Sequence, residues 1–220
     1  MNIVIGIISY FPDNNTRTIR CTNLLTLINK CNVCFNIPIL IVAQNYTEQE
    51  ADTIGAEKNV TLTHHPKLGI VGARKELRKL FLESEYDYLI MLDDDCIIGG
   101  TPSDAQKYLE AIQKHPGGWG AKRKRLLKLF AISREVYSQI EMPDINPEKN
   151  EGFEDILFYE TLRTKFRNSE FEFQTRLTES SNSSTDPNST WRNEYKNSIN
   201  RKELCENTTK AIQKMKGLIK

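Results

Sequence analysis

The chain has 220 residues, 39% of them hydrophobic, and its 30 Lys and Arg residues against 29 Asp and Glu residues give a formal net charge of +1. This length suffices for one sizeable core or two small ones, and the composition is not that of a disordered chain. The near-zero charge gives no global field that would indicate nucleic acid or a membrane surface as the partner, and no apolar run is long enough for a membrane span.

The compartment is indicated by the first residues and by the cysteines. The segment 1–10 has neither a basic leader nor a small-residue cleavage site, so we expect a first strand there and not a signal peptide. The odd, scattered cysteines favour reduced thiols in a cytoplasmic protein. They are Cys21, Cys31, Cys34, Cys96 and Cys205. Because the Cys31–Cys34 pair has no second ligand pair nearby, we expect ordinary buried cysteines there and not a zinc site.

The first hundred residues alternate between strand and helix patterns. Short apolar runs predict strands at 3–9, 37–42, 60–63 and 88–92. Apolar residues at helical spacing predict helices between them, at 18–30, 49–56 and 71–83. This repetition predicts a parallel sheet with right-handed crossovers, whose ligands would bind at the carboxyl edge.

The second half is less regular, and without an internal repeat or a clear linker we interpret 1–220 as a single domain. The glycines of 117–120 predict a turn, and the polar run 179–188 predicts a flexible loop or lid. The other predicted elements are helices at 103–114, 134–140, 156–166 and about 201–219, and strands at 126–132 and 171–177.

The fourth predicted strand ends in three consecutive carboxylates, Asp93, Asp94 and Asp95. Two carboxylates about 4–5 Å apart repel by roughly 3–4 kcal/mol at an effective dielectric constant near 20. A divalent cation, protonation or full solvation relieves this repulsion. At the carboxyl edge of a sheet the triplet is well placed to hold a hard metal and, through it, a phosphate, and a solvated acidic turn without a ligand is the alternative.

Two further segments carry candidate site residues. Gly69 and Gly72 let the backbone approach a ligand closely, and Arg74 with the helix N-terminus favours an anion, although a plain helix start explains this pattern as well. Glu154 and Asp155 open another predicted helix, where carboxylates commonly do no more than compensate the helix dipole.

Together, the Gly-x-x-x-Ala-Arg helix start, the hydrophobic strand ending in Asp-x-Asp and the downstream Glu-Asp resemble the GT-A glycosyltransferases, especially the inverting family 2. The resemblance covers residues 1 to about 175. It implies an α/β fold with a Rossmann-like, mostly parallel sheet flanked by helices and a smaller C-terminal acceptor-side part. It divides the domain into a nucleotide-sugar half (1–100), an acceptor half (101–178) and a polar loop with a C-terminal helix (179–220).

The resemblance also implies residue roles. The metal, Mn²⁺ or Mg²⁺, would be bound by Asp93 and Asp95, and Asp155 or Glu154 would be the acceptor-side catalytic carboxylate. The residues implied on the side of the nucleotide-sugar donor are Ser9, Tyr10, Gly69, Gly72, Arg74, Asp93 and Asp94. The chain departs from the family at Lys75, where Asn is common, at 43–45, which lacks the acidic pattern that often contacts uracil, and beyond His115, where no histidine follows.

Glycosyl transfer suits such a site, because a divalent ion offsets the charge on the leaving diphosphate and a carboxylate takes the acceptor's proton if the reaction inverts. A retaining reaction would dispense with that base, and the sequence leaves both outcomes open. We therefore predict transfer of a hexose from a nucleotide-diphosphate sugar, a UDP-sugar being expected, to a hydroxyl acceptor. The alternatives are a nucleotidyltransferase, which is expected to have a Gly- and Lys/Arg-rich loop where this chain has 10–15, and a non-catalytic binding module.

The acceptor is expected to be a glycan. A fainter resemblance links the opening segment to phage enzymes that add glucose to hydroxymethylated or glucosylated cytosine in DNA. The dense basic cluster Lys122–Arg125 would then contact phosphates, although a solvated loop explains it as well. Trp119 and Trp191 are candidates for stacking on a sugar or a base, or for packing in the core.

Overall fold

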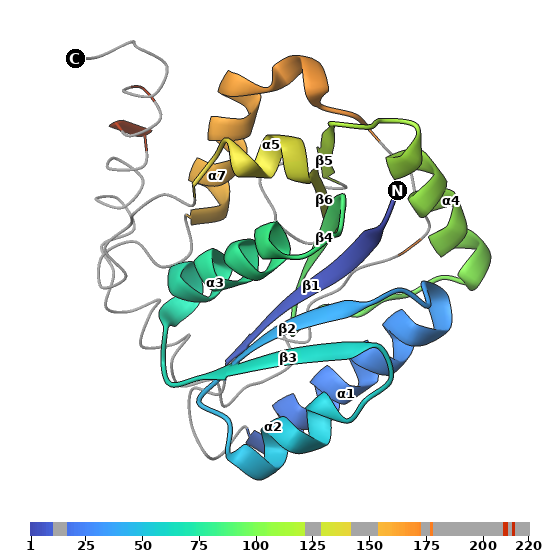
Figure 1. Cartoon of the computed structure of the whole chain (residues 1–220), viewed down its shortest axis with the longest axis vertical. Helices are drawn as coiled ribbons and strands as arrows, with labels where there is room; N and C mark the ends of the chain where they lie inside the picture. Colours follow the sequence, from blue (N-terminus) through green and yellow to red (C-terminus); the bar gives the residue numbers. More distant parts are fainter. Residues whose placement is uncertain are drawn as a thin grey trace.

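The computed structural model describes residues 1–10, 17–121, 129–141 and 154–172, and the single positions 177, 209, 210 and 213. In this part of the chain, one sheet is covered by helices on both faces (Figure 1). The strands are β1 (Ile3–Tyr10), β2 (Ile39–Gln44), β3 (Val60–His65), β4 (Tyr88–Asp93), β5 (Trp119–Ala121) and β6 (Phe130–Ser133). The helices are α1 (Arg17–Cys34), α2 (Glu48–Gly55), α3 (Gly69–Glu83), α4 (Pro102–Gln113), α5 (Arg134–Ser138) and α7 (Glu154–Lys165), with the short 3-10 helix η1 (Arg167–Ser169).

The sheet has the order β3-β2-β1-β4-β6-β5. The strands β3, β2, β1 and β4 are parallel to their neighbours, whereas β6 is antiparallel to both β4 and β5. This confirms the α/β fold with a mostly parallel sheet that the sequence predicts. Because the chain moves outward from β1 to β3 and then returns to place β4 on the other side of β1, a topological switch point lies between β1 and β4. In open α/β sheets, ligands bind at such a point, outside the carboxyl ends of the strands.

Alternation along β1 separates the two faces of the sheet. Ile5 and Ile7 join the core cluster that includes residues of α1, α2 and α4, whereas Val4 and Ile8 join the cluster that includes residues of α3, α5 and α7. The two helical layers are visible on opposite sides of the sheet in Figure 1. A strand buried on both faces reads as a continuous apolar run, which is why β1, β2 and β4 are recognisable in the sequence.

Gly6, in the middle of β1, allows α3 to approach the sheet. A Cβ atom on Gly6 would lie 2.7 Å from Leu89 Cδ1 and 2.8 Å from Leu77 Cδ2, closer than van der Waals contact permits. The glycine therefore sets the distance between the sheet and α3, which begins at the carboxyl edge just after the β3–α3 loop.

Three predictions in the second half are wrong in part. The predicted turn 117–120 ends at Gly117, because Trp119 and Gly120 belong to β5. The strand predicted at 126–132 begins only at Phe130, since Leu129 is a turn residue with φ of 50°, while 126–128 lie outside the described residues.

The strand predicted at 171–177 is not present in its described positions. A single parallel bridge joins Glu170 to Trp119, and Phe171, Glu172 and Leu177 lie in no strand. The remaining predictions that fall outside the described residues are the polar loop 179–188, the basic cluster 122–125, Trp191 and Cys205. The predicted C-terminal helix is represented by Thr209, Lys210 and Gln213, which are helical.

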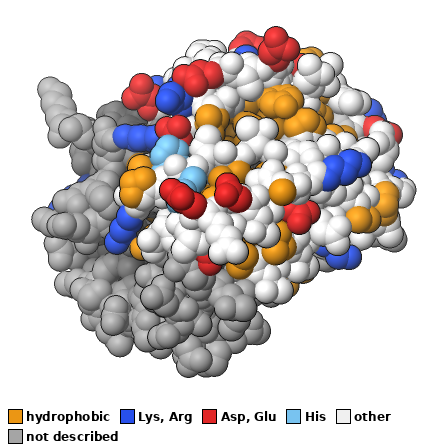
Figure 2. Space-filling model, turned by 60° about the horizontal axis from the view of Figure 1, so that its bottom comes forward, with side chains coloured by type: hydrophobic (Ala, Val, Ile, Leu, Met, Phe, Trp, Pro, Cys, Tyr) orange, Lys and Arg blue, Asp and Glu red, His pale blue; other side chains and the backbone are white. Residues whose placement is uncertain are grey.

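The structure confirms that Cys31 and Cys34 are buried, as the sequence predicts. Cys31 and Cys34 are buried in the core, and burial, with a smaller contribution from Cys34, raises the pKa of Cys31 to about 12. Charges of both signs are interspersed on the face formed by α2 and β3 (Figure 2). None of the described helices combines the length and the hydropathy that crossing a membrane requires.

Candidate functional site at the carboxyl edge of the sheet

The acidic triplet lies on a tight turn at the switch point. Asp93 ends β4 and pairs in register with Ile8 of β1, so Asp94 and Asp95 follow directly beside the end of β1. The Cys96 amide donates to the carbonyl of Asp93 at 3.0 Å and closes the turn. The three carboxylates are therefore held at the predicted carboxyl edge, with different neighbours for each.

Asp94 is bound by the end of β1 and by α1. Its Oδ2 accepts hydrogen bonds from Ser9 Oγ at 2.7 Å, from the Tyr10 amide at 3.4 Å and from Arg20 Nη1 at 3.5 Å. The side chain is 14% exposed. Burial raises the pKa of the Asp94 carboxyl above its usual range, while Arg20 and Ser9 oppose that shift and the charges of Asp95 and Asp93 add to it.

Asp93 faces a different cation. Arg74 Nη2 lies 3.3 Å from Asp93 Oδ1, and the arginine is only 4% exposed while the carboxylate is 25% exposed. A buried guanidinium is stable only when it is paired. Because Arg74 belongs to the first turns of α3, this ion pair ties the start of α3 to the end of β4.

The charges of this cluster nearly balance. The guanidiniums of Arg20 and Arg74 beside the carboxylates of Asp93, Asp94 and Asp95 leave one formal negative charge. A divalent cation would reverse that charge to one positive unit, which suits an anionic diphosphate. The predicted metal is compatible with this balance of charge, in which Arg74 Nη2 lies 3.3 Å from Asp93 Oδ1.

The protein supplies few ready metal ligands of its own. Within the described ranges, no group of three or more His, Cys, Asp or Glu side chains is arranged to hold a metal ion. The residues fit a hard ion that takes one or two carboxylate oxygens from Asp95 and Asp93 and completes its shell with diphosphate and water, as Mg²⁺ and Mn²⁺ do at nucleotide sites.

The loop before α3 is positioned by Gln44, a residue that the sequence analysis did not assign to the site. The buried side chain of Gln44, at the end of β2, accepts a hydrogen bond from the Leu68 amide at 2.8 Å through its Oε1. Gly69 follows with φ of 72°, a left-handed conformation that favours glycine, and begins α3. The Lys67 ammonium lies 5.9 Å from the centre of the Tyr10 ring, so this loop reaches the end of β1.

The predicted acceptor-side residues lie at the start of α7. Asp155 Oδ1 accepts from the amide of the adjacent Ile156 at 2.8 Å, within the first turn of α7, where a carboxylate compensates the helix dipole. The side chain of Glu154 lies outside the described residues. Through Phe158 and Tyr159, α7 packs in the same layer as α3.

The predicted site residues therefore fall into two groups. Direct contacts join Ser9, Tyr10, Arg74, Asp93 and Asp94 at one edge of the sheet, and Gly69 and Gly72 belong to the first turn of α3 beside them. The pair Glu154 and Asp155 belongs to a separate element. Sequence reasoning missed Arg20, Gln44 and Tyr46, because only the arrangement of β1, β2 and α1 brings these scattered residues to the same edge.

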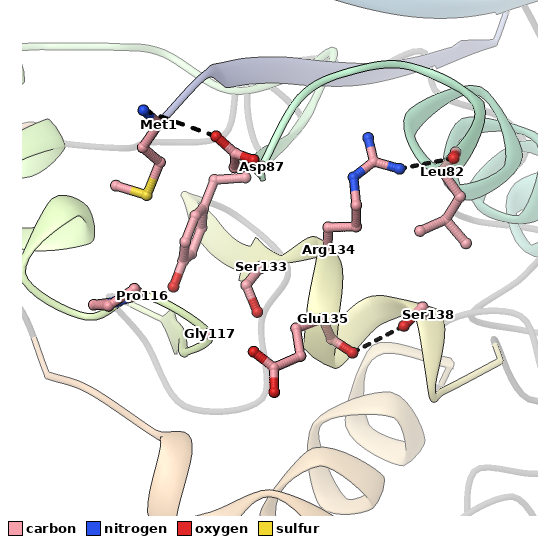
Figure 3. A pocket seen from close by; sticks show the side chains of 10 residues that line it. Met1, Leu82, Asp87, Pro116, Gly117, Ser133, Arg134, Glu135 and Ser138 are labelled. Atoms are coloured by element: carbon pink, nitrogen blue, oxygen red, sulfur yellow. Dashed lines mark hydrogen bonds and ion pairs between the residues drawn. The ribbon is translucent and has the colours of Figure 1, made fainter.

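A separate open cleft of about 740 Å³ lies at the opposite, amino edge of the parallel strands (Figure 3). Its lining includes Met1, Asp87 and Glu135, and the Glu135 carboxylate projects into it in Figure 3. Arg134 turns toward α3 instead, where its guanidinium donates to the carbonyl of Leu82 at 2.7 Å. None of the predicted site residues lines this cleft.

Comparison with known proteins identifies the fold. Neither a family model nor a curated protein matches the sequence. Among solved structures, S. aureus TarS matches with a TM-score of 0.58 and 12% identity, over 81% of this chain and 36% of TarS. The structure of TarS 1–349 in complex with UDP-GlcNAc matches with 0.50 and 14%, over 73% and 52% of the two chains. A Bacillus anthracis putative glucose-1-phosphate thymidylyltransferase matches with 0.52 and 12%, over 82% and 89%.

These likenesses define the class of structure: an α/β fold that GT-A glycosyltransferases share with nucleotidyltransferases. The resemblance to GT-A glycosyltransferases that the motifs indicate is confirmed at the level of the fold. The chain spans about a third of the length of TarS, the first of these structures.

Proposed function

We propose that this protein is a metal-dependent glycosyltransferase that moves a hexose from a nucleotide-diphosphate sugar to a hydroxyl group, with a glycan as the acceptor. The observation that supports this most is the cluster at the switch point, where two guanidiniums leave three adjacent carboxylates with a single formal negative charge. A site for a metal–diphosphate pair needs both signs of charge at once.

On the donor side, Asp95 and Asp93 would hold Mn²⁺ or Mg²⁺, which when bound would offset the negative charge that develops on the leaving diphosphate. The Arg74 guanidinium would hold Asp93 in place and add positive charge beside the phosphates. Ser9 and Tyr10, at the end of β1, would lie beside the nucleotide base. Gly69 and Gly72, at the start of α3, would let the backbone approach the nucleotide closely.

On the acceptor side, Asp155 or Glu154 would accept the proton of the attacking hydroxyl if the reaction inverts. The Ile156 amide donates to Asp155 Oδ1 at 2.8 Å and so holds this carboxylate in the first turn of α7. In a retaining reaction the same carboxylates would orient the acceptor only.

A nucleotidyltransferase is the second candidate, because the fold is also that of a putative thymidylyltransferase. That reaction needs a nucleoside triphosphate and a sugar phosphate, and its product is the sugar nucleotide that a glycosyltransferase consumes. A DNA acceptor is a variant of the first candidate and would require the basic cluster Lys122–Arg125.

A thermal-shift screen with Mn²⁺ and five nucleoside diphosphates (UDP, dTDP, CDP, GDP and ADP) tests the donor site. A ligand at 100 times its dissociation constant stabilises the folded state by about 2.7 kcal/mol, enough to rank the bases. Glycosyl transfer predicts that one diphosphate and its sugar bind with Mn²⁺ and that Asp95→Ala abolishes the Mn²⁺ dependence. Turnover of a triphosphate with a sugar phosphate, and none of a diphosphate sugar, would establish the second candidate instead.

A further inference from the structure

The contacts of Asp94, the middle carboxylate of the triplet, connect residues from four helices and strands or the turns that follow them. A serine hydroxyl has one proton, and that of Ser9 is donated to Asp94 Oδ2, so in the Ser9–Tyr46 hydrogen bond the tyrosine must be the donor. The chain of bonds runs from Tyr46, just after β2, through Ser9 of β1 to Asp94, after β4. Arg20 of α1 reaches the same carboxylate oxygen.

One oxygen therefore holds three donors, whereas neighbouring Asp93 has its own cation in Arg74. The Arg20 guanidinium also donates to the Tyr10 carbonyl at 3.4 Å. Asp94 therefore binds the backbone amide of Tyr10, at the end of β1, and Arg20 binds the backbone carbonyl of the same residue. Tyr10 is thus held at its backbone by two groups that come from distant parts of the sequence.

Resting on the proposed function, we infer that Asp94 is a positioning residue: through Ser9, Tyr10 and Arg20 it holds the nucleotide-facing end of β1, and it is a ligand of neither the metal nor the donor. The resemblance to GT-A enzymes implies a donor-side contact for Asp94, and the geometry assigns it to the protein instead. The triplet then divides its roles between Asp93 and Asp95, for the metal, and Asp94, for the protein.

A purely structural role does not require a carboxylate. Replacing a buried ionic group by apolar side chains of similar volume is often neutral or stabilising, so a buried carboxylate with several donors points to the specification of geometry. That geometry is local to the strand end that the donor would meet. The consequence is that changes at Asp94 and at Arg20 should affect nucleotide binding through the same interaction.

The test compares single and double variants for two separate affinities. The affinity for the best of the five diphosphates is measured at saturating Mn²⁺, and the Mn²⁺ affinity is measured at saturating diphosphate. Asp94→Asn can keep the Ser9 bond through its amide oxygen but loses the charge that holds Arg20. We expect Asp94→Asn and Arg20→Met each to weaken diphosphate binding about tenfold, as for one charge-assisted hydrogen bond, and the double variant to be no weaker than either alone.

The Mn²⁺ affinity should stay within about twofold in these variants and fall by more than tenfold in Asp95→Asn. Asp104→Asn is the matched control, because Asp104 also accepts two bonds, from Thr101, but caps α4 near the last turn of α1, away from the carboxyl edge. It should leave both affinities unchanged. If Asp94→Asn does not fold, Arg20→Met alone, measured for both affinities, tests the same interaction.

Three results would overturn the inference while leaving the proposed function standing: an Mn²⁺ affinity that falls in Asp94→Asn as it does in Asp95→Asn, diphosphate binding unchanged in Asp94→Asn, or additive losses in the double variant. Wild-type protein that binds none of the five diphosphates with Mn²⁺ would contradict the proposed function itself, and the inference with it.

Discussion

Replacing Arg74 by methionine tests the ion pair that joins α3 to the acidic turn. At 3.3 Å and an effective dielectric constant of 20, the attraction between Arg74 and Asp93 is about 5 kcal/mol, which the desolvation of both groups largely offsets. Removing one partner of a buried pair destabilises by about 3–5 kcal/mol, because the other charge stays behind. Asp93 remains 25% exposed, so water compensates part of that loss and we expect about 2–3 kcal/mol.

The measurement is the free energy of unfolding in urea, followed by tryptophan fluorescence. The double variant Arg74→Met/Asp93→Asn should recover at least about 1 kcal/mol relative to the sum of the single losses, because it also removes the carboxylate charge that Arg74 contacts. Lys75→Met is the matched control: it removes an exposed cation one residue along the same helix and should change stability by less than about 0.5 kcal/mol. Arg74→Met as stable as Lys75→Met, or fully additive losses in the double variant, would refute the reasoning.

Three further predictions concern the core. Gly6→Ala should destabilise by about 1–3 kcal/mol in the same urea assay, since the added methyl group forces two core leucines aside; an unchanged midpoint would contradict the close approach of α3. Burial raises the pKa of Tyr137, which the nearby Arg74 and Arg78 only partly oppose, so stability should be complete below pH 10 and fall by up to about 1.4 kcal/mol per pH unit as the pH rises toward the folded-state pKa. Tyr137→Phe should remove that part of the loss at little cost at pH 7, because the hydroxyl makes no hydrogen bond within the described structure; identical alkaline curves for both proteins would argue against this. Iodoacetamide at pH 8 should label Cys31 far more slowly than the half-buried Cys21 in mass spectrometry, and equal rates would show that Cys31 is accessible.

The first hundred residues were predictable because their elements are regular and their sheet is buried on both faces. The apolar runs of β1, β2 and β4 and the helical spacing of α3 are local signals, and the structure contains each of these elements. The prediction of α1 ended at residue 30, whereas the helix continues to Cys34, since helix ends carry weaker signals than helix centres.

The error at β5 has a specific physical cause. The glycine pattern predicts a turn at Gly118 and Gly120, but a Cβ atom on Gly120 would lie 2.8 Å from Phe171, and one on Gly118 would lie 3.0 Å from it. These glycines allow the ring to pack across the strand, the close approach for which strands also use glycine. Phe171 is some fifty residues further along the chain, so no local pattern could separate the two explanations.

The sequence predicts where the acidic triplet lies in the fold, but it does not predict that its three carboxylates have different contacts. The sequence places three identical carboxylates in a row, and nothing local distinguishes Asp94 from its neighbours. The distinction arises because β4 pairs with β1 in a register that sets Asp93 beside Ile8, so the next carboxylate meets Ser9 and the helix that follows β1. Arg20 reaches the same carboxylate because α1 follows β1.

The return of the chain across β1 also explains why the binding of a metal ion at this site would depend on the diphosphate of the donor. It brings the ends of β1, β4 and α3 together with two arginines already beside the acidic turn, and the described part of the chain offers no preformed group of three metal-ligating side chains. A hard cation prefers six oxygen ligands, so one held by Asp95 and Asp93 must take others from diphosphate and water. Mn²⁺ and diphosphate should therefore each strengthen the binding of the other by the same factor, because linkage is reciprocal. Calorimetric titrations that find equal Mn²⁺ affinity with and without the diphosphate would show that the protein alone completes the metal site.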